Sequence, residues 1–158
     1  MCEKLKIDYI NLNLKLNNLY WKIFFKKMKL NYYVFNFLKN CKKSGLKINI
    51  ITDFDLNTQL KKIKKLKIEK YISFITSSEE CGSDKPNKSI FLKAIKKLKV
   101  KKKDICLIGD DFNKDIKGAV ENKIFAFWLT KKKAYKINVG IKFDIFSNFN
   151  QLNKKIFF

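Results

Sequence analysis

The stretch "CLIGDDFNKDIKGA", residues 106–119, runs from a continuous apolar segment into a glycine, several carboxylates and then a helical pattern. Unbroken apolar segments of this kind are typical of strands that are buried on both faces of a parallel sheet. Asp110 and Asp111 follow the predicted strand directly, and Asp115 falls in the first turn of the predicted helix. Because hard cations such as Mg²⁺ prefer carboxylate oxygens, the stretch predicts a cation site, although the same residues could simply cap the helix.

Short apolar strands alternate with amphipathic helices on both sides of this stretch. This order predicts an α/β fold, a Rossmann-like parallel sheet with helices on both faces. Ligands bind such sheets at the carboxyl ends of the strands, so we expect Thr52, Asp53, Ser77 and Ser78 to share one cleft with residues 109–111. The expected elements are strands at 48–52, 71–75, 105–108, 124–129 and 144–146, and helices at 20–30, 32–43, 57–67, 87–98, 113–122 and 148–155.

The charge balance excludes several kinds of catalysis. All 36 basic residues are Lys, against 14 acidic residues, which gives a formal net charge of +22, and there is no His. Catalysis by a histidine base, a Ser-His-Asp triad and zinc bound by histidine are therefore excluded. No two of the four cysteines have CxxC spacing, so zinc and thioredoxin-like chemistry have no support either.

The basic charge itself has two interpretations. One is a basic nucleic-acid-binding protein or a protein that binds an anionic membrane surface. The other is an A/T-rich coding sequence, because Lys, Asn, Ile and Phe make up more than half of the chain. Base recognition favours Arg, which is absent, so we expect no specific nucleic-acid partner. The N-terminus lacks the apolar core of a signal peptide and no apolar run could span a bilayer, so we expect no membrane partner and a cytoplasmic location.

Three segments carry a resemblance to a known family. They are "IITDF" at 50–54 with Gln59, "SSEECGSDKPNKSIF" at 77–91 and "LIGDDFNKDIKGA" at 107–119. In this order they resemble the second, third and fourth motifs of the haloacid dehalogenase-like (HAD) hydrolase superfamily, in particular its phosphatases with a helical cap. The resemblance covers about residues 20–158.

The resemblance implies phosphoryl transfer to an aspartate nucleophile, assisted by Mg²⁺, on a small phosphorylated metabolite. Thr52 and Lys85 would be catalytic, Thr52 by donating to the phosphoryl group and Lys85 by neutralising charge. The same two residues and Asp53 would bind the phosphate. The residues implied to hold Mg²⁺ are Asp110, Asp111 and Asp115.

The family's first motif, Asp-x-Asp-x-Thr at the end of a strand, is missing from its expected place upstream of Thr52. The only Asp before that position is Asp8, which lacks the second carboxylate and the threonine of the motif and is expected in a surface loop or at a helix end. The pair Asp53 and Asp55 also imitates the motif, but its threonine comes one position late.

The missing motif shapes the expected fold and activity. In this family the nucleophile strand lies between the strands that end near Thr52 and Asp110, so we expect those two strands to face a gap. The resemblance implies a remnant of a helical cap at 1–30 and a HAD-like core without its first strand at 31–158. We expect a truncated phosphatase that is weakly active or inactive alone. The alternatives are a non-catalytic remnant and a subunit that needs a polypeptide to supply the missing strand.

Overall fold

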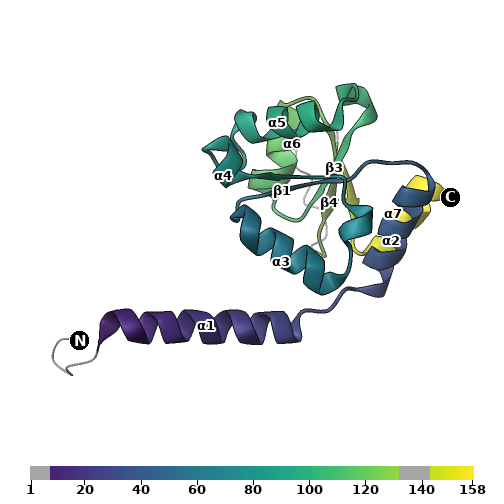
Figure 1. The fold of residues 1–158 in the computed structure, drawn as a ribbon. Coiled ribbons are helices and arrows are strands. Elements are labelled where there is room, and N and C mark those ends of the chain that lie inside the picture. The colour runs from purple at the N-terminus through teal and green to yellow at the C-terminus, as the bar shows by residue number, and fades with distance from the viewer. Residues whose placement is uncertain (1–7, 132–142) are drawn as a thin grey trace. The chain divides into compact units, whose positions relative to one another are not determined.

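The computed structural model of the chain describes residues 8–131 and 143–158, whose fold is shown in Figure 1. The chain divides into two units, Met1–Leu30 and Asn31–Phe158, which are described separately here. That the first unit derives from a cap remains a prediction. In the part of the chain that the structure describes, no helix is long and apolar enough to cross a membrane.

The described part of the first unit contains the helix α1 (Tyr9–Lys27). Asp8 caps it, because its carboxylate accepts a hydrogen bond from the Asn11 N–H (3.0 Å), which confirms the expected place of Asp8 at a helix end. No residue of α1 is buried. Three half-buried aromatic rings near its C-terminal end pack on one another at centroid separations of 5.4–5.8 Å: Trp21, Phe24 and Phe25.

The second unit contains parallel strands that are divided between two sheets. The first sheet pairs β1 (Asn49–Thr52) with β2 (Phe74–Ser77). The second sheet pairs β3 (Cys106–Gly109) with β4 (Phe125–Leu129), and β4 with β5 (Phe143–Phe146). The parallel α/β fold is therefore confirmed, and so is the break in pairing between the strands that end at Thr52 and Gly109.

Two hydrophobic cores lie on opposite faces of these strands. In β3, Leu107 packs against the first core and its neighbour Ile108 against the second, because successive residues of a strand point to opposite faces. Both cores extend to the other sheet, through Ile51 on the first face and Ile48 on the second. The buried residues are Ile90, Phe91, Ile116, Ala119, Ile124 and Ala126 in the first core, and Phe37, Cys41, Phe146 and Leu152 in the second.

Helices cover both faces, as expected. On the face of the first core, α5 (Lys88–Leu98) packs against β1 and β2 and against α6 (Lys117–Glu121). On the face of the second core, α2 (Tyr32–Lys43) packs against α7 (Phe149–Phe157). The helix α3 (Leu56–Leu66) contacts β2 and lies on the other side of the strands from α5 (Figure 1). The strands are thus enclosed between two helical layers.

One predicted strand begins three residues later than expected. The apolar pattern at 71–75 predicts a strand there, but Glu69–Tyr71 form a 3-10 turn (η2), and β2 begins at Phe74. Tyr71 is buried because its ring packs edge-on against that of Phe35 in α2, with centroids 5.9 Å apart. The burial of Tyr71 in a turn was therefore mistaken for the start of a strand.

The segments around α5 and α6 also differ in detail from the prediction. The helix predicted at 113–122 starts as a π-helical turn, η4 (Phe112–Ile116), and continues as α6. The helix α5 is capped by Asn87, whose side chain accepts a hydrogen bond from the Ser89 N–H (2.9 Å). Two short elements were not predicted: α4 (Ser78–Cys81) and η3 (Lys102–Asp104).

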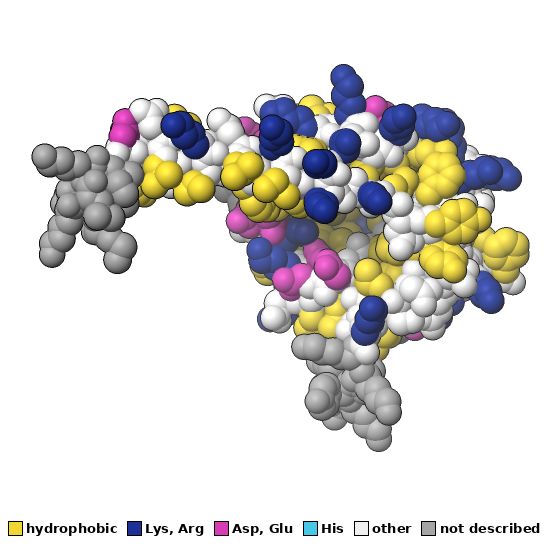
Figure 2. Space-filling model, turned by 90° about the horizontal axis from the view of Figure 1, so that it is seen from below, with side chains coloured by type: hydrophobic (Ala, Val, Ile, Leu, Met, Phe, Trp, Pro, Cys, Tyr) yellow, Lys and Arg dark blue, Asp and Glu magenta, His cyan; other side chains and the backbone are white. Residues whose placement is uncertain are grey.

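The lysines are distributed over the surface. Figure 2 shows their side chains separated by hydrophobic and acidic ones on the visible face. Several are paired locally, as Lys93 and Lys97 are with Glu80, and Lys155 with Asp144. On that face, the basic charge does not gather into one continuous patch.

Candidate functional site

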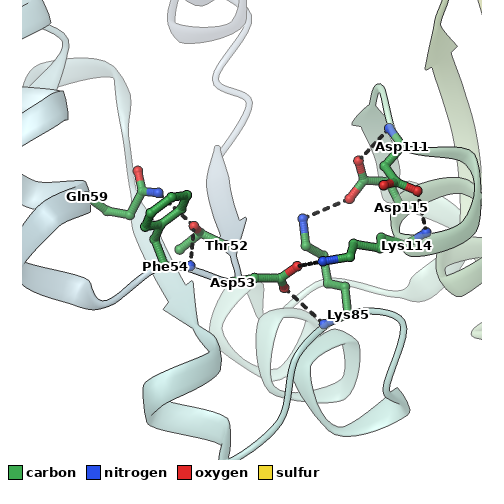
Figure 3. Close-up of polar contacts among 8 residues, drawn as sticks. All are labelled: Thr52, Asp53, Phe54, Gln59, Lys85, Asp111, Lys114 and Asp115. Carbon is green, nitrogen blue, oxygen red and sulfur yellow. Dashed lines mark hydrogen bonds and ion pairs between the residues drawn. The ribbon is translucent and has the colours of Figure 1, made fainter. Parts of the chain in front are cut away.

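The carboxyl end of β1 provides the hydroxyl of Thr52, a buried residue. Its Oγ1 accepts hydrogen bonds from Nε2 of Gln59 in α3 (2.7 Å) and from the Phe54 N–H (3.1 Å), as Figure 3 shows. A hydroxyl accepts through two lone pairs and donates through one proton. These two contacts occupy the lone pairs, so the proton of Thr52 remains available to donate to an anionic ligand.

Replacing Thr52 by Val should lower the free energy of unfolding by about 1–2 kcal/mol, because two partly buried donors lose their acceptor. Thr52→Ser keeps the oxygen and should recover most of that stability. Urea denaturation followed by circular dichroism measures both variants. A loss in Thr52→Ser as large as that in Thr52→Val would contradict this expectation, because Ser keeps the hydroxyl and lacks only the methyl group.

Asp53 joins two other segments of the site. Its Oδ1 accepts from the Lys85 N–H (3.0 Å) and its Oδ2 from Nζ of Lys114 (3.1 Å). Burial alone would raise the pKa of Asp53, but the hydrogen bonds and charges of these two lysines outweigh it and hold the pKa below its ordinary value. Since both carboxylate oxygens are engaged, residue 53 would contact a phosphate through its backbone N–H and not through its side chain.

Lys85 lies in the segment that leads from β2 to α5, and only 14% of its side chain is exposed. Its Nζ pairs with Oδ1 of Asp115 (2.8 Å), whose Oδ2 accepts from the Asp111 N–H (3.1 Å). These contacts bring Lys85 to the tip of β3, where Asp110 also lies, so the predicted lysine and carboxylates meet at one rim. Which roles they play remains a prediction.

Two ion pairs link the two sheets at this rim (Figure 3). Lys85 pairs with Asp115 and Asp53 with Lys114, so each pair joins a residue that follows β1 or β2 to one in η4 after β3. The first pair is mostly shielded from solvent, whereas the Lys114 side chain is 48% exposed, and exposed pairs contribute little to stability. The sequence did not indicate Lys114, because nothing around it distinguishes it from the other lysines.

The three predicted metal ligands have different environments. Asp115 is buried and held by Lys85 and the Asp111 amide, while Asp111 accepts from the Lys114 N–H through Oδ1 (2.9 Å). Asp110 is exposed, and its backbone carbonyl accepts from Nε1 of Trp128 (3.0 Å). Within residues 8–131 and 143–158, no three Asp, Glu, Cys or His side chains form a group that could hold a metal ion.

These carboxylates suit Mg²⁺, which needs few protein ligands, better than a metal ion that is coordinated by protein side chains alone. Mg²⁺ keeps several waters and is often bound by only one or two carboxylates together with a substrate phosphate. The side chains of Asp110 and Asp111 at the strand tip suit that arrangement, because both residues are exposed. Asp115, which is buried and paired with Lys85, suits the task of holding the loop in shape.

An open depression of about 490 Å³ adjoins the rim. Its lining includes the carboxylates of Asp55, Glu79 and Asp84, and Asp84 directly precedes Lys85. Two of these carboxylates are engaged at the start of α3, because Glu79 accepts from the Leu56 N–H (3.0 Å) and Asp55 from the Thr58 N–H (2.8 Å). A ligand at the rim would therefore have lysines on one side and an acidic hollow on the other.

The comparison with protein families agrees with this geometry. A family model described as "Haloacid dehalogenase-like hydrolase" matches residues 4–129, which include β1 to β4 and the rim. The resemblance inferred from the three motifs is therefore confirmed.

Several curated relatives are named as phosphatases. The chain is 29% identical over 106 residues to a ribulose-1,5-bisphosphate 5-phosphatase of Halopiger xanaduensis, a match that covers 67% of this chain and 44% of the relative. It is 34% identical over 82 residues to a glyceraldehyde 3-phosphate phosphatase of Methanopyrus kandleri, covering 52% of this chain and 35% of the relative. The chain thus spans less than half the length of these relatives.

Solved structures share the fold. A HAD phosphatase from Thermococcus onnurineus aligns with a TM-score of 0.70 at 22% identity, over 80% of this chain and 57% of that structure. A 2-haloacid dehalogenase from Pseudomonas syringae aligns with a TM-score of 0.71 at 22% identity, over 89% of this chain and 60% of that structure. Because the family model matches well over half of the residues, the chain belongs to the haloacid dehalogenase-like hydrolases.

Proposed function

We propose that the chain forms the phosphoryl-binding and metal-binding part of a Mg²⁺-dependent phosphatase that acts on small phosphorylated metabolites. The observation that supports the proposal is the set of contacts that link the strand ends: Asp53, next to Thr52, accepts from the Lys85 N–H and from Lys114, and the Lys85 ammonium pairs with Asp115 beside the acidic tip of β3. The named activities of the curated relatives support it, because they too act on small phosphorylated compounds.

Each rim residue has a task in this proposal. Thr52 donates its free proton to a phosphoryl oxygen, and the backbone N–H of Asp53 adds a second donor. Lys85 neutralises charge on the phosphoryl oxygens, which develops further as the bond to the leaving group breaks. Its ion pair with Asp115 fixes the ammonium in place before the ligand arrives, so little side-chain entropy is lost on binding.

The proposal assigns the metal to Asp110 and Asp111. A Mg²⁺ ion bound there would polarise the phosphoryl group and offset its charge. Asp115 holds the loop that carries these two carboxylates, since its Oδ2 accepts from the Asp111 amide. The Trp128 indole also holds this loop, by donating a hydrogen bond to the Asp110 carbonyl.

We further propose that Met1–Leu30 is the remnant of a helical cap and that Asn31–Phe158 is the catalytic core. In this view the chain alone is weakly active or inactive, because the rim carries phosphate and metal ligands but its carboxylates are engaged by lysines or assigned to the metal. The alternative is that the chain is a non-catalytic remnant, which would bind phosphate at this rim without hydrolysing a phosphate ester.

Lys85→Met should weaken the binding of inorganic phosphate in the presence of Mg²⁺ by about 10- to 100-fold, since it removes a charged hydrogen-bond donor. Isothermal titration calorimetry measures the affinity, and circular dichroism verifies that the variant is folded. Lys88→Met is the matched control, because it removes the same charge from an exposed residue three positions away. Equal affinities for the Lys85 and Lys88 variants would reject the proposed phosphate site.

A further inference from the structure

We propose that the edge of the second unit at which its strands begin, opposite the rim, binds a single strand of nucleic acid through its phosphates and without preference for its sequence. The surface is formed by the connections that lead into β1, β2, β3 and β4, and we call their lysines the basic edge. The proposal does not depend on the proposed phosphatase. The residues of the basic edge are Lys47, Lys67, Lys70, Lys99, Lys101, Lys102, Lys103 and Lys123.

The parallel strands place these connections along one edge. β1 pairs with β2 and β3 with β4 in the parallel sense. β1 and β3 end at the same rim, where Asp53 after β1 pairs with Lys114 after β3. All four strands therefore begin at the opposite edge. The connections that lead into them lie along that edge and comprise residues 44–48, 67–73, 99–105 and 122–124.

The charges of the second unit are separated between these two ends of the strands. The four connections contain the eight lysines of the basic edge and two carboxylates, those of Glu69 and Asp104. An A/T-rich coding sequence explains many lysines, but it does not explain why lysines and acidic residues occupy opposite ends. The segments that follow the strands, 53–55, 78–87 and 110–116, contain only two lysines and eight carboxylates, those of Asp53, Asp55, Glu79, Glu80, Asp84, Asp110, Asp111 and Asp115.

Three lysines of the basic edge occupy backbone positions that disfavour a lysine. Lys67, Lys99 and Lys123 have φ angles of 55°, 54° and 62°, in the left-handed region where Gly and Asn are favoured. Lys67 and Lys99 are the C-caps of α3 and α5, and Lys123 follows the C-cap of α6. Asn also has A/T-rich codons and is abundant in this chain, so coding bias does not explain why Lys occupies all three positions.

The side chains at these three positions are available to an anionic ligand. Lys67, Lys99 and Lys123 are exposed, and within residues 8–131 and 143–158 no carboxylate forms an ion pair with any of them. The helix dipole favours a lysine at the end of α3 or α5, but its effect falls off within the last turn. Lys101 and Lys103 lie beyond α5 and are exposed as well, so the dipole does not account for them.

The arrangement of the basic edge favours a linear polyanion. Neighbouring strands of a sheet lie about 4.8 Å apart, so the connections form a narrow row across the strand ends, unlike the broad plane that contacts a membrane. Tyr71 is the one aromatic residue in the four connections and is buried, so these connections offer no ring on which a base could stack. Since the chain also lacks Arg, the phosphates of the strand are the groups that it can bind.

A triple variant of the basic edge tests the proposal: Lys67→Asn, Lys99→Asn and Lys123→Asn in one chain. Asn is favoured over Lys in the left-handed region, so the variant should be at least as stable as the unaltered chain, which urea denaturation verifies. The probe is a fluorescein-labelled oligouridylate of about 20 nucleotides, longer than a typical single-strand site. Its affinity for the full chain is measured by fluorescence anisotropy at several salt concentrations.

The edge variant should bind the probe at least about tenfold more weakly at constant salt. The slope of log K against log salt should become shallower by about 2, because each phosphate contact of a single strand contributes about 0.7. A control variant removes the same charge from exposed helical positions outside the basic edge and should bind less than about threefold more weakly. Its substitutions are Lys39→Gln, Lys61→Gln and Lys88→Gln.

Three outcomes would overturn the proposal. The first is an equal loss of affinity in the two triple variants, because binding would then follow the net charge and not the basic edge. The second is that the unaltered chain does not bind the probe at about 0.1 M salt. The third is binding to vesicles of phosphatidylcholine and phosphatidylserine that the oligouridylate cannot displace, because the partner would then be a membrane.

Discussion

The chain alone should hydrolyse p-nitrophenyl phosphate no faster than a buffer that contains the same Mg²⁺. Asp53 and Asp115 are both held by lysines, and Asp8 caps a helix in the other unit. Without a carboxylate free to attack phosphorus, the covalent step is lost. Groups that act as one unit fail together, so we expect a rate at least about 10⁴-fold below that of a complete site. The hydrolysis rate is measured from the release of p-nitrophenolate in the presence of Mg²⁺, and again with a chelator that removes Mg²⁺.

Substitutions identify the residue responsible if turnover is nevertheless observed. Turnover abolished by Asp8→Asn would make Asp8 the nucleophile, against the prediction. Turnover insensitive to Asp8→Asn but lost in Asp110→Asn would require another carboxylate at the rim, with Asp53 and Asp55 as the residues to substitute next. The Asp55 carboxylate caps α3 by accepting from the Thr58 N–H (2.8 Å), so its loss should also weaken that helix.

Phe91→Ala should lower the free energy of unfolding by about 3–5 kcal/mol, the range for removing a large buried side chain and leaving a cavity. Phe91 is fully buried in the first core. The fit around it is tight, because a Cβ atom added to Gly118 would lie 2.5 Å from its Cζ. Urea denaturation with detection by circular dichroism measures the loss.

The neighbouring residue Leu92 offers a matched control. It lies in the same helix and is 42% exposed, so Leu92→Ala changes helix propensity in a similar way and should cost less than about 1 kcal/mol. If Phe91→Ala does not fold, Phe91→Leu should still show a loss of about 1–2 kcal/mol. Equal effects at the two positions would contradict the packing of α5 on the first core.

The sequence predicted most strands because packing on two faces imposes an apolar pattern that is visible locally. In β3 and β4 the residues on both faces contact a core, so the pattern is continuous. In α1 no residue is buried, so packing selects no helical face in its first half, and a helix was predicted only from residue 20 onwards. The start of β2 was misplaced because a core also buries Tyr71 in a turn, and burial does not distinguish a turn from a strand.

Site residues could be predicted where they lie at the end of a predicted strand or beside a residue type that is rare in this chain. Thr52 ends a strand, Asp110 directly follows one, and Lys85 stands beside the chain's one proline. Lys114 was not predictable, because its contact with Asp53 depends on the π-helical turn that presents Lys114 and Asp115 to different partners. Hydrogen bonds between distant segments, such as that from Gln59 to Thr52, require the fold before they can be recognised.

The division of the strands into two sheets also affects the order in which the chain can fold. Every strand pair joins neighbours along the sequence, β1 with β2 and β3 with β4 with β5, so the loops that close on pairing are short. Short loops lose little entropy on closure and allow fast folding. On the ribosome the first sheet can form before residues 106–146 have been synthesised.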